Sequence, residues 1–431
     1  KKNMKKIGIG IVGLGNIGSR LYKEIISKKK DIGLKTSTNI TIAAISARNI
    51  NKKRSFKVRR NIFFKNPLDI TKNPKVNIVI ELIGLSDGIS KKIVERALKN
   101  KKHVITANKA LISKHGDYLA SIAEKNKVNL EFEAAVGGGI PVLRTIKDGL
   151  ATNKINKIVG ILNGTSNYIL SEMQKTKNSF KNVLNKAQQL GFAETKPKFD
   201  LDGTDVLAKI RILSSLSFNN KISKNNCLMN GIENIELKDI DMAEKLDLRI
   251  KLLGITEIIN NKLFERVHPC LIKKDNYIAN IDGVMNAVIL EANPVGESVL
   301  QGEGAGPGPT SSALMSDLLS ILRGNIKYPF GIPFNKRKKV SSYDQNQYSN
   351  SLYLRFEVRD RPGVLSQITN RLANYKISVK RIIQTPDKKR NSATIVIITH
   401  KTSEKNARNC LSIFRRNRNI LKFPTLIRLY N

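Results

Sequence analysis

Tryptophan, paired cysteines and long apolar runs are missing from this sequence of 431 residues. Its three cysteines, Cys227, Cys270 and Cys410, lie far apart and form no ligand pattern with the four histidines, so neither a disulfide framework nor a structural zinc site is expected. No stretch reaches the ~18 consecutive apolar residues of a membrane-spanning helix, and the first residues lack the apolar core of a signal peptide. We therefore expect a soluble, cytoplasmic protein with no membrane partner.

Acidic residues are also scarce, because 35 Asp and Glu stand against 76 Lys and Arg and give a formal net charge of +41. A charge of this size attracts nucleic acid whatever the fold, so a basic nucleic-acid-binding protein is the first alternative to an enzyme. The densest basic runs, at 27–30, 335–339 and 414–418, are separate and contain no interleaved aromatic residues. We expect the charge to lie on solvated faces and no specific nucleic-acid partner.

The pattern of apolar residues predicts an α/β protein of several domains. Strand-like and helical runs alternate through residues 1–135, which is typical of a Rossmann-type nucleotide-binding domain. Residues 136–300 mix the two types and are expected to form an α+β catalytic domain with strands at 157–163, 276–283 and 286–292.

Three further segments follow this second region. The glycine-rich loop and amphipathic helix of 301–330 are expected to pack back onto the first domain and complete it. Residues 335–351 are polar and without periodicity, which indicates a linker. The order strand, helix, strand, strand, helix, strand in 352–431 predicts a ferredoxin-like module.

A glycine fingerprint follows the first predicted strand and opens a helix. Its residues Gly13, Gly15, Asn16, Ile17 and Gly18 fit a dinucleotide site in which the glycines allow a tight turn, close approach of a pyrophosphate, and close helix packing. A glycine-rich turn without a ligand is the alternative.

The end of the second predicted strand should meet the adenosine ribose. An NAD site usually offers Asp or Glu there, whereas this sequence has Arg48, followed by Lys52, Lys53 and Arg54. A guanidinium suits a 2′-phosphate, so NADP(H) is the preferred cofactor and NAD(H) remains possible. Arg48 is alternatively one more solvated base.

Carboxylates are concentrated in residues 187–209, which read "AQQLGFAETKPKFDLDGTDVLAK". This pattern resembles the signature of homoserine dehydrogenases. Further pieces resemble the same family in the expected order, at 106–111, 133–141, 161–170 and 302–313, and "DRPGVLSQI" at 360–368 resembles the first turn of an ACT domain. The resemblance implies reversible reduction of L-aspartate 4-semialdehyde to L-homoserine, in threonine, methionine and isoleucine biosynthesis.

The resemblance also implies roles for residues of the carboxylate cluster. Gly191 and Glu194 would contact the substrate, Asp205 would hold its amino group, Asp200 would organise the pocket, and Lys209 would donate the proton. The residues themselves agree, because the alkoxide left by hydride transfer needs a proton, and Lys209 lies one helical turn after Asp205. The alternative is an ordinary surface ion pair worth only ~0.3–0.5 kcal/mol. Lys196, before Pro197, and Phe199 depart from the family pattern.

Three more parts of the site follow from the resemblance. Lys109 would lie between substrate and cofactor, at the end of a strand where open α/β sheets bind ligands. Gly306 would approach the nicotinamide end of the cofactor. A sodium ion would be held in the glycine loop by the backbone carbonyls of Glu133, Val136, Gly138 and Ile140. The alternative interpretation of this loop is a hinge between domains.

The C-terminal module is expected to bind an amino-acid effector, with Asp360 and Gly363 at the turn where backbone amides can receive a carboxylate. The alternative for this module is that it only joins subunits. The alternative for the whole chain is a sensor that keeps the fold but has no catalytic activity. We expect a homodimer or homotetramer.

Overall fold

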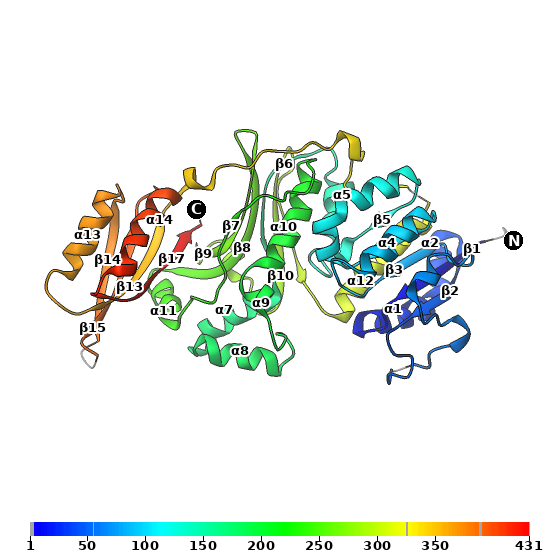
Figure 1. The fold of residues 1–431 in the computed structure, drawn as a ribbon, viewed down its shortest axis with the longest axis horizontal. Helices are drawn as coiled ribbons and strands as arrows, with labels where there is room; N and C mark the ends of the chain where they lie inside the picture. Colours follow the sequence, from blue (N-terminus) through cyan, green and yellow to red (C-terminus); the bar gives the residue numbers. More distant parts are fainter. Residues whose placement is uncertain (1–3, 55, 325, 388–389, 431) are drawn as a thin grey trace.

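The computed structural model describes residues 4–54, 56–324, 326–387 and 390–430. Figure 1 shows an elongated molecule with the N-terminal sheet at one end, a central sheet, and the C-terminal module at the other end. Within the described residues, no helix combines the length and the apolar character needed to cross a membrane.

The N-terminal unit is a five-stranded parallel sheet in the order β2-β1-β3-β4-β5. Its strands are β1 (Lys5–Val12), β2 (Thr38–Ser46), β3 (Ile78–Glu81), β4 (His103–Thr106) and β5 (Leu130–Glu131). The helices of this unit are α1 (Asn16–Ser27), α2 (Lys29–Thr36), α3 (Pro67–Ile70), α4 (Ile89–Lys99), α5 (Lys109–Lys125) and α12 (Pro307–Leu322). Helix α12 returns from far along the chain, and its Leu314 and Leu318 share one core with Ile9 and Ile11 of β1. This is the Rossmann-type arrangement.

The central unit is an antiparallel sheet, with β11-β10-β6-β8-β9 as its strand order. The strands are β6 (Lys154–Ile161), β7 (Leu228–Met229), β8 (Leu248–Ile259), β9 (Lys262–Lys273), β10 (Met285–Asn293) and β11 (Gly296–Glu303). The helices are α6 (Val142–Arg144), α7 (Gly164–Thr176), α8 (Phe180–Gln189), α9 (Lys198–Leu201), α10 (Thr204–Ser217) and α11 (Leu237–Lys245).

The strand predicted at 276–283 is wrong. Residues Tyr277–Asn280 form a 3₁₀ turn instead, in which the Asn276 side chain accepts a hydrogen bond from the Ile278 amide at 3.1 Å. A side chain that satisfies a nearby backbone amide offers the chain an alternative to a sheet ladder.

The C-terminal module has the expected ferredoxin-like order. Its elements are β13 (Leu352–Arg359), α13 (Val364–Asn374), β14 (Val379–Asp387), β15 (Ser392–Thr399), α14 (Glu404–Ile413) and β17 (Ile420–Leu429). Strand β17 also pairs in parallel with β9, through Arg428 opposite Cys270 and Leu429 opposite Leu271. The central sheet therefore continues into the module as one ten-stranded sheet.

Side chains reinforce this continuous sheet. Tyr353, Ile398 and Ile427 of the module belong to the same core as the central unit. Arg355 of β13 donates from Nε to Asp239 Oδ1 of α11 at 2.7 Å, and both side chains are almost completely buried. The module is docked by its own core residues as well as by a strand.

The segment 335–351 lies along the first two units. Arg337 is buried, donates to the Asn220 carbonyl at 2.9 Å and forms an ion pair with Asp117 at 2.7 Å. Isolated backbone bridges join Lys338 to Asn220 and Ser342 to Leu263. The domain boundaries assigned from the sequence stay predictions.

Candidate functional site

Each glycine of the fingerprint occupies a position with its own steric demand. Gly13 has φ 101°, and a Cβ there would lie 2.8 Å from the Leu82 carbonyl oxygen. A Cβ on Gly18 would lie 1.9 Å from the Gly13 carbonyl oxygen, so α1 can approach the turn only because this side chain is absent. A Cβ on Gly15 would meet nothing within 4 Å. The space over Gly15 is open for a ligand.

A cavity of about 300 Å³ adjoins Gly15 and Asn16 at the N-terminus of α1. Its remaining walls are strongly basic: Arg20, Lys23, Lys52, Lys53 and Arg54 line it. A helix N-terminus surrounded by cations suits the phosphates of a dinucleotide. The residues present therefore fit the NAD(P) that the fingerprint implies. Ile17 lies one residue further along α1.

The basic loop after β2 is held in place by one arginine. Arg54 donates to the carbonyls of Asn49 at 2.9 Å, Lys52 at 3.0 Å and Leu14 at 3.3 Å. Arg48 is exposed and does not line the cavity at Gly15, whereas Lys52 and Lys53 do. The structure thus separates the three bases proposed from the sequence for phosphate recognition.

Glu81, at the end of β3, organises the loop that faces the cofactor turn. It is fully buried; Oε1 accepts from the amides of Ile83 at 2.8 Å and Gly84 at 3.3 Å, and Oε2 accepts from Thr106 Oγ1 at 2.8 Å. The sequence reasoning missed this residue. The available signal was a lone carboxylate at the end of an apolar strand, which needs partners when it is buried.

Lys109 is the first residue of α5, and its neighbour Asn108 fixes that start. Asn108 Oδ1 accepts from the Leu111 amide at 3.0 Å, which is an N-cap. Its Nδ2 donates to the Leu85 carbonyl at 2.7 Å. The Lys109 side chain is thereby presented from the end of β4 toward the central unit.

Asp205 bridges two lysines at the junction of the N-terminal and central units. Its Oδ1 lies 2.6 Å from Lys109 Nζ and its Oδ2 lies 2.7 Å from Lys209 Nζ. Asp205 and Lys209 are buried on α10, while Lys109 is half-buried. The predicted helical-turn spacing of Asp205 and Lys209 is confirmed, and the two are not an exposed surface pair.

Asn163 completes this cluster and was missed from the sequence as a single residue. Its Nδ2 donates to Asp200 Oδ1 at 2.8 Å and to Asp205 Oδ2 at 2.9 Å, and its Oδ1 caps α7. Lys209 Nζ also donates to the Leu162 carbonyl at 2.5 Å. The stretch 161–170 that was noted in the sequence therefore supplies a side-chain donor and a backbone acceptor.

The pKa values in the cluster are shifted by burial and by neighbouring charges. Burial lowers the pKa of Lys209, and the neighbouring Lys109 ammonium lowers it further. The Asp205 carboxylate raises it, but by less, so the pKa of Lys209 is below its ordinary value. Burial alone would raise the pKa of Asp205, but the two ammonium groups outweigh it and lower that pKa. Burial raises the pKa of Asp200, against the hydrogen bond from Asn163. A proton held at Lys209 is thus easier to release than one on a free lysine.

The remaining predicted substrate residues lie on the loop between α8 and α9. Gly191 has φ 76° and, like Glu194, is exposed. Burial lowers the pKa of Lys109, but the carboxylates of Asp205, Asp200 and Glu194 raise it by more, so the pKa is above its ordinary value. Glu194 therefore lies close enough to interact with the charge of Lys109. The structure brings the acidic residues and both lysines together at one end of α10.

The departures from the family pattern lie in the same region, with Lys196 on this loop and Phe199 in α9. Both residues are exposed, and Phe199 is 66% accessible. They leave the hydrogen bonds around Asp200 and Asp205 untouched.

The predicted cation loop packs against the second glycine-rich loop. Gly138 has φ 54°, a Cβ there would lie 2.4 Å from Gly304, and the Gly139 amide donates to the Glu303 carbonyl at 3.0 Å. The carbonyls of Glu133 and Ile140 accept from the amides of Val136 and Val142 at 3.3 and 2.8 Å.

The free oxygens of this loop decide whether a cation fits. In the described part of the chain, the Val136 and Gly138 carbonyls accept no hydrogen bond. No group of three acidic, histidine or cysteine side chains that could hold a metal occurs among the described residues. A cation here would therefore be bound by backbone oxygens.

Gly306, with φ 108°, is the N-cap of α12 and directly follows the loop that contacts Gly138.

The predicted effector residues lie in the C-terminal module. Asp360 and Gly363 are exposed between β13 and α13, and Gly363 has φ 86° with open space where a Cβ would be. Figure 1 places α13 at the end of the molecule opposite the N-terminal sheet, so the structure does not bring these two residues to the lysine cluster.

Family models match three parts of the chain: "Homoserine dehydrogenase, NAD binding domain" at 13–133, "Homoserine dehydrogenase" at 141–319, and "ACT domain" at 352–416. Among curated relatives, the homoserine dehydrogenase of Neisseria gonorrhoeae is 38% identical and covers 99% of both chains. That of Helicobacter pylori is 36% identical over 99% of this chain and 100% of its own.

Solved structures agree with these relatives. A homoserine dehydrogenase from Thiobacillus denitrificans superposes with a TM-score of 0.90 at 34% identity, covering 99% of both chains. The enzyme from S. aureus gives a TM-score of 0.76 at 31% identity, over 99% of this chain and 100% of that one. The fingerprint turn, the lysine cluster and the C-terminal module thus occur together in a chain that belongs to the homoserine dehydrogenase family of NAD(P)-dependent oxidoreductases.

Proposed function

We propose that this protein reversibly reduces L-aspartate 4-semialdehyde to L-homoserine with a preference for NADP(H), and that Lys209 donates the proton. The observation that carries the proposal is the pair of ion pairs made by the Asp205 carboxylate. It contacts Lys109 of the N-terminal unit at 2.6 Å and Lys209 of the central unit at 2.7 Å. Bound cofactor would supply the hydride. The proposal extends to a role in threonine, methionine and isoleucine biosynthesis.

Proton transfer is assigned to Lys209 because of its surroundings. An ammonium carries three protons, and two of the Lys209 donor positions are used by Asp205 and the Leu162 carbonyl. The third is available to an alkoxide. Its lowered pKa makes that proton easier to release than the proton of an ordinary lysine.

Substrate binding is assigned to the acidic residues around Lys209. Asp205 would hold the amino group, because carboxylates suit an ammonium. Gly191 and Glu194 would contact the substrate beside it. Asp200 would organise the pocket through Asn163. Lys109, at the edge of the cluster, would contact both substrate and cofactor. Gly306, at the start of α12, would lie against the nicotinamide end.

The direct test is homoserine oxidation by the purified protein with NADP or NAD in turn, followed by absorbance of the reduced cofactor. We expect turnover with both and a higher kcat/KM with NADP. Absence of turnover with either cofactor would overturn the proposed activity. Salt-resistant binding of nucleic acid without turnover would favour the alternative drawn from the charge of +41.

NADP selectivity is proposed to depend on Arg48 or on the cavity-lining Lys52 and Lys53. Replacing a phosphate-pairing base by Asp should lower the NADP-to-NAD ratio of kcat/KM by roughly tenfold or more, because a carboxylate suits a free 2′-hydroxyl. Comparing Arg48→Asp with Lys52→Asp and Lys53→Asp identifies the base. An unchanged ratio in all three variants contradicts the selectivity argument.

Two ligands are proposed beyond the cofactor. A sodium ion would bind the carbonyls of Val136 and Gly138, with those of Glu133 and Ile140, and its test is activity in sodium against a large organic cation. An amino acid, with L-threonine the first candidate, would bind at Asp360 and Gly363. The cytoplasmic location and a homodimer or homotetramer stay predictions.

The effector assignment is tested by calorimetry with L-threonine on the full chain. Binding that Asp360→Ala weakens, with inhibition lost in parallel, would support it. If threonine neither binds nor inhibits at millimolar concentration, the threonine assignment fails while the dehydrogenase activity stands.

A further inference from the structure

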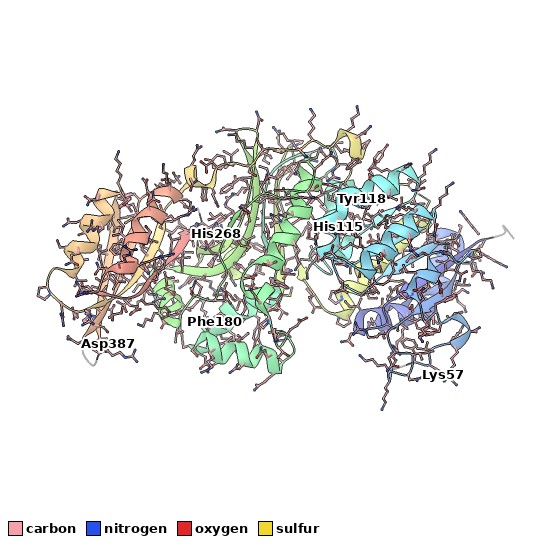
Figure 2. The ribbon with its side chains drawn as sticks, in the orientation of Figure 1. Lys57, His115, Tyr118, Phe180, His268 and Asp387 are labelled. Atoms are coloured by element: carbon pink, nitrogen blue, oxygen red, sulfur yellow. The ribbon has the colours of Figure 1, made fainter. Side chains whose placement is uncertain are left out.

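A second cavity, of about 550 Å³, lies where the central sheet meets the C-terminal module. Figure 2 shows His268 of β9 at this junction, and the next residue, Pro269, lines the cavity. The other walls come from β7 and the residues after it, from β17, and from α14. A volume of this size suits a small molecule. It is separate from the lysine cluster and from the turn at Asp360 and Gly363.

Helix α14 presents one face to this cavity. The side chains that line it recur at helical spacing and continue into the turn after the helix: Glu404, Arg408, Leu411, Ser412 and Arg415. Residues with this spacing share one side of a helix. The face therefore offers two guanidinium groups and a hydroxyl to a single ligand.

The charges around the cavity do not balance. Arg428 is paired with Glu404 by contacts of 2.5 and 2.9 Å, and Lys422 is paired with Glu236. In contrast, Arg408 and Arg415 are exposed and pair with no carboxylate among the described residues. Unpaired guanidinium groups recognise carboxylate and phosphate through paired hydrogen bonds. The cavity is therefore suited to an anion.

Part of the cavity lining is apolar. Phe423 and Met229 are 47% and 38% exposed, and the Arg415 guanidinium lies 5.1 Å from the centre of the Phe423 ring. Large apolar side chains beside unpaired cations favour a ligand with a carbon skeleton over a bare inorganic ion.

The floor of the cavity connects to the lysine cluster through a short series of contacts. Arg428 Nη1 donates to Asn230 Oδ1 at 3.0 Å. The neighbouring Gly231 is so close to the turn before α10 that a Cβ would lie 2.2 Å from the Leu201 carbonyl oxygen. The Ile232 amide donates to that same oxygen at 2.9 Å.

This contact reaches the catalytic helix. The turn at Leu201 leads directly to Gly203, the N-cap of α10, which carries Asp205 and Lys209. Because the backbones are in direct contact, a shift of Asn230 must move this turn or be resisted by it.

We propose that this cavity binds a small organic anion bearing a carboxylate or a phosphate group, and that its occupancy alters substrate affinity by moving segment 228–232 against the turn that begins α10. The site differs in helix, charge and position from the effector site proposed at Asp360 and Gly363. Linkage requires that the anion and homoserine change each other's affinity by the same factor.

Binding is tested by calorimetry on the full chain saturated with NADPH, so that the basic cavity at Gly15 is already filled. The probes are succinate and inorganic phosphate, which separate a carboxylate site from a phosphate site. We expect one probe to bind, and the double substitution Arg408→Ala/Arg415→Ala to weaken it roughly tenfold or more. The matched control is Arg416→Ala, an exposed arginine outside the cavity lining.

Two results would overturn the site: no heat from either probe at millimolar concentration, or equal affinity in the double variant and the wild type. The replaced arginines are exposed, so an unchanged melting temperature checks that the variants fold. Hydrogen exchange of the amides at 228–232 gives a second readout, and we expect slower exchange on binding in the wild type and the Arg416→Ala protein only.

Coupling is tested by measuring KM for homoserine with and without the bound probe. We expect a shift in KM in the wild type and its loss in Asn230→Ala, while that variant still binds the probe. An unchanged KM in the wild type with the cavity saturated would overturn the coupling. Because homoserine turnover without the probe is measured in every variant, failure of the anion site is distinguishable from failure of the proposed reaction.

Discussion

Two clusters of buried charge lie on opposite sides of the central unit and differ in how completely their donors are used. At Arg355, Nε and Nη2 donate to both oxygens of Asp239 at 2.7 and 3.1 Å, Nη2 also donates to Thr425, and Nη1 donates to Glu357. Tyr353 adds a hydrogen bond to Asp239 at 2.9 Å. The arginine cluster is closed.

The lysine cluster is open by comparison. Lys209 uses two of its three donor positions, and Lys109 makes one described contact, with Asp205, from a half-buried side chain. In the closed arginine cluster the donors are used by partners within the protein, so the cluster stabilises the fold. In the open lysine cluster some donor positions are unused and can bind a ligand. The difference indicates that burial of charge alone is a poor marker of a candidate functional site, and that unused hydrogen-bonding capacity is the more useful observation.

Removing the donor of the open cluster should have the largest effect. Lys209→Ala is expected to lower kcat by ~10²–10⁴-fold, the scale for loss of a positioned general acid. Asp205 keeps Lys109 as a partner, so the melting temperature should change little. Steady-state kinetics and thermal unfolding measure both, with the exposed Lys186→Ala as the control. Turnover near the wild-type level would assign the proton to another group.

Breaking the closed cluster should act on stability instead. Arg355→Ala leaves the Asp239 carboxylate buried without its cation, which typically costs about 3–5 kcal/mol. We expect a large loss in the free energy of unfolding with unchanged kcat for the folded fraction, measured in urea and by activity. Arg359→Ala, on the same strand but exposed, is the matched control. A loss of kcat without a loss of stability would reverse the assignment of the two clusters.

The pH dependence sharpens the comparison. Lys209 has a lowered pKa, caused first by burial, so it loses its proton at a lower pH than an ordinary lysine. Semialdehyde reduction needs the protonated form and should fall as pH rises through this value, while homoserine oxidation should rise. The measured value is an apparent one for the coupled cluster. A reduction rate that is flat up to the pH where free lysine titrates would contradict a lysine donor with a lowered pKa.

The smallest expected effect is at Asn163. Asn163→Ala removes the amide donor to Asp200 and Asp205 and the cap of α7. We expect kcat/KM to fall roughly tenfold through misplaced carboxylates and about 1 kcal/mol of stability to be lost with the cap. Asn163→Ser keeps a capping oxygen without the amide, so it should regain stability but not activity. If Ser restores both, Asn163 is only a cap.

Local patterns in the sequence predicted the parts of the site that lie close together along the chain. The glycine turn and the pairing of Asp205 with Lys209 are both within one or two helical turns, where spacing decides geometry. Asn163 was missed because Asp200 and Asp205, to which it donates, lie far away along the chain, and no periodicity encodes such contacts. Two partners of Glu81, the amides of Ile83 and Gly84, are close in sequence, but its burial beside the distant Thr106 leaves no periodic signal either. The roles of the site residues stay predictions.

The fold shows the same division. The Rossmann-type sheet and the ferredoxin-like module followed from alternating runs. The long hairpin of β8 and β9 was not predicted, although its turn at Asn260 and Asn261, with φ of 49° and 60°, is the kind that asparagine favours. The continuous sheet through β9 and β17 could not be predicted, because a two-residue pairing across separate domains leaves no local signal.

That short pairing has a consequence for any attempt to separate the module from the dehydrogenase. Without β17, the end of β9 around Cys270, Leu271 and Ile272 becomes a free strand edge, and the apolar surface now covered by Tyr353 and Ile427 faces water. Unprotected apolar edges recruit other strands and promote aggregation. A chain cut before residue 352 should therefore self-associate, which light scattering would detect. Replacing Leu271 by a charged residue in the shortened chain, as in Leu271→Lys, should suppress this self-association.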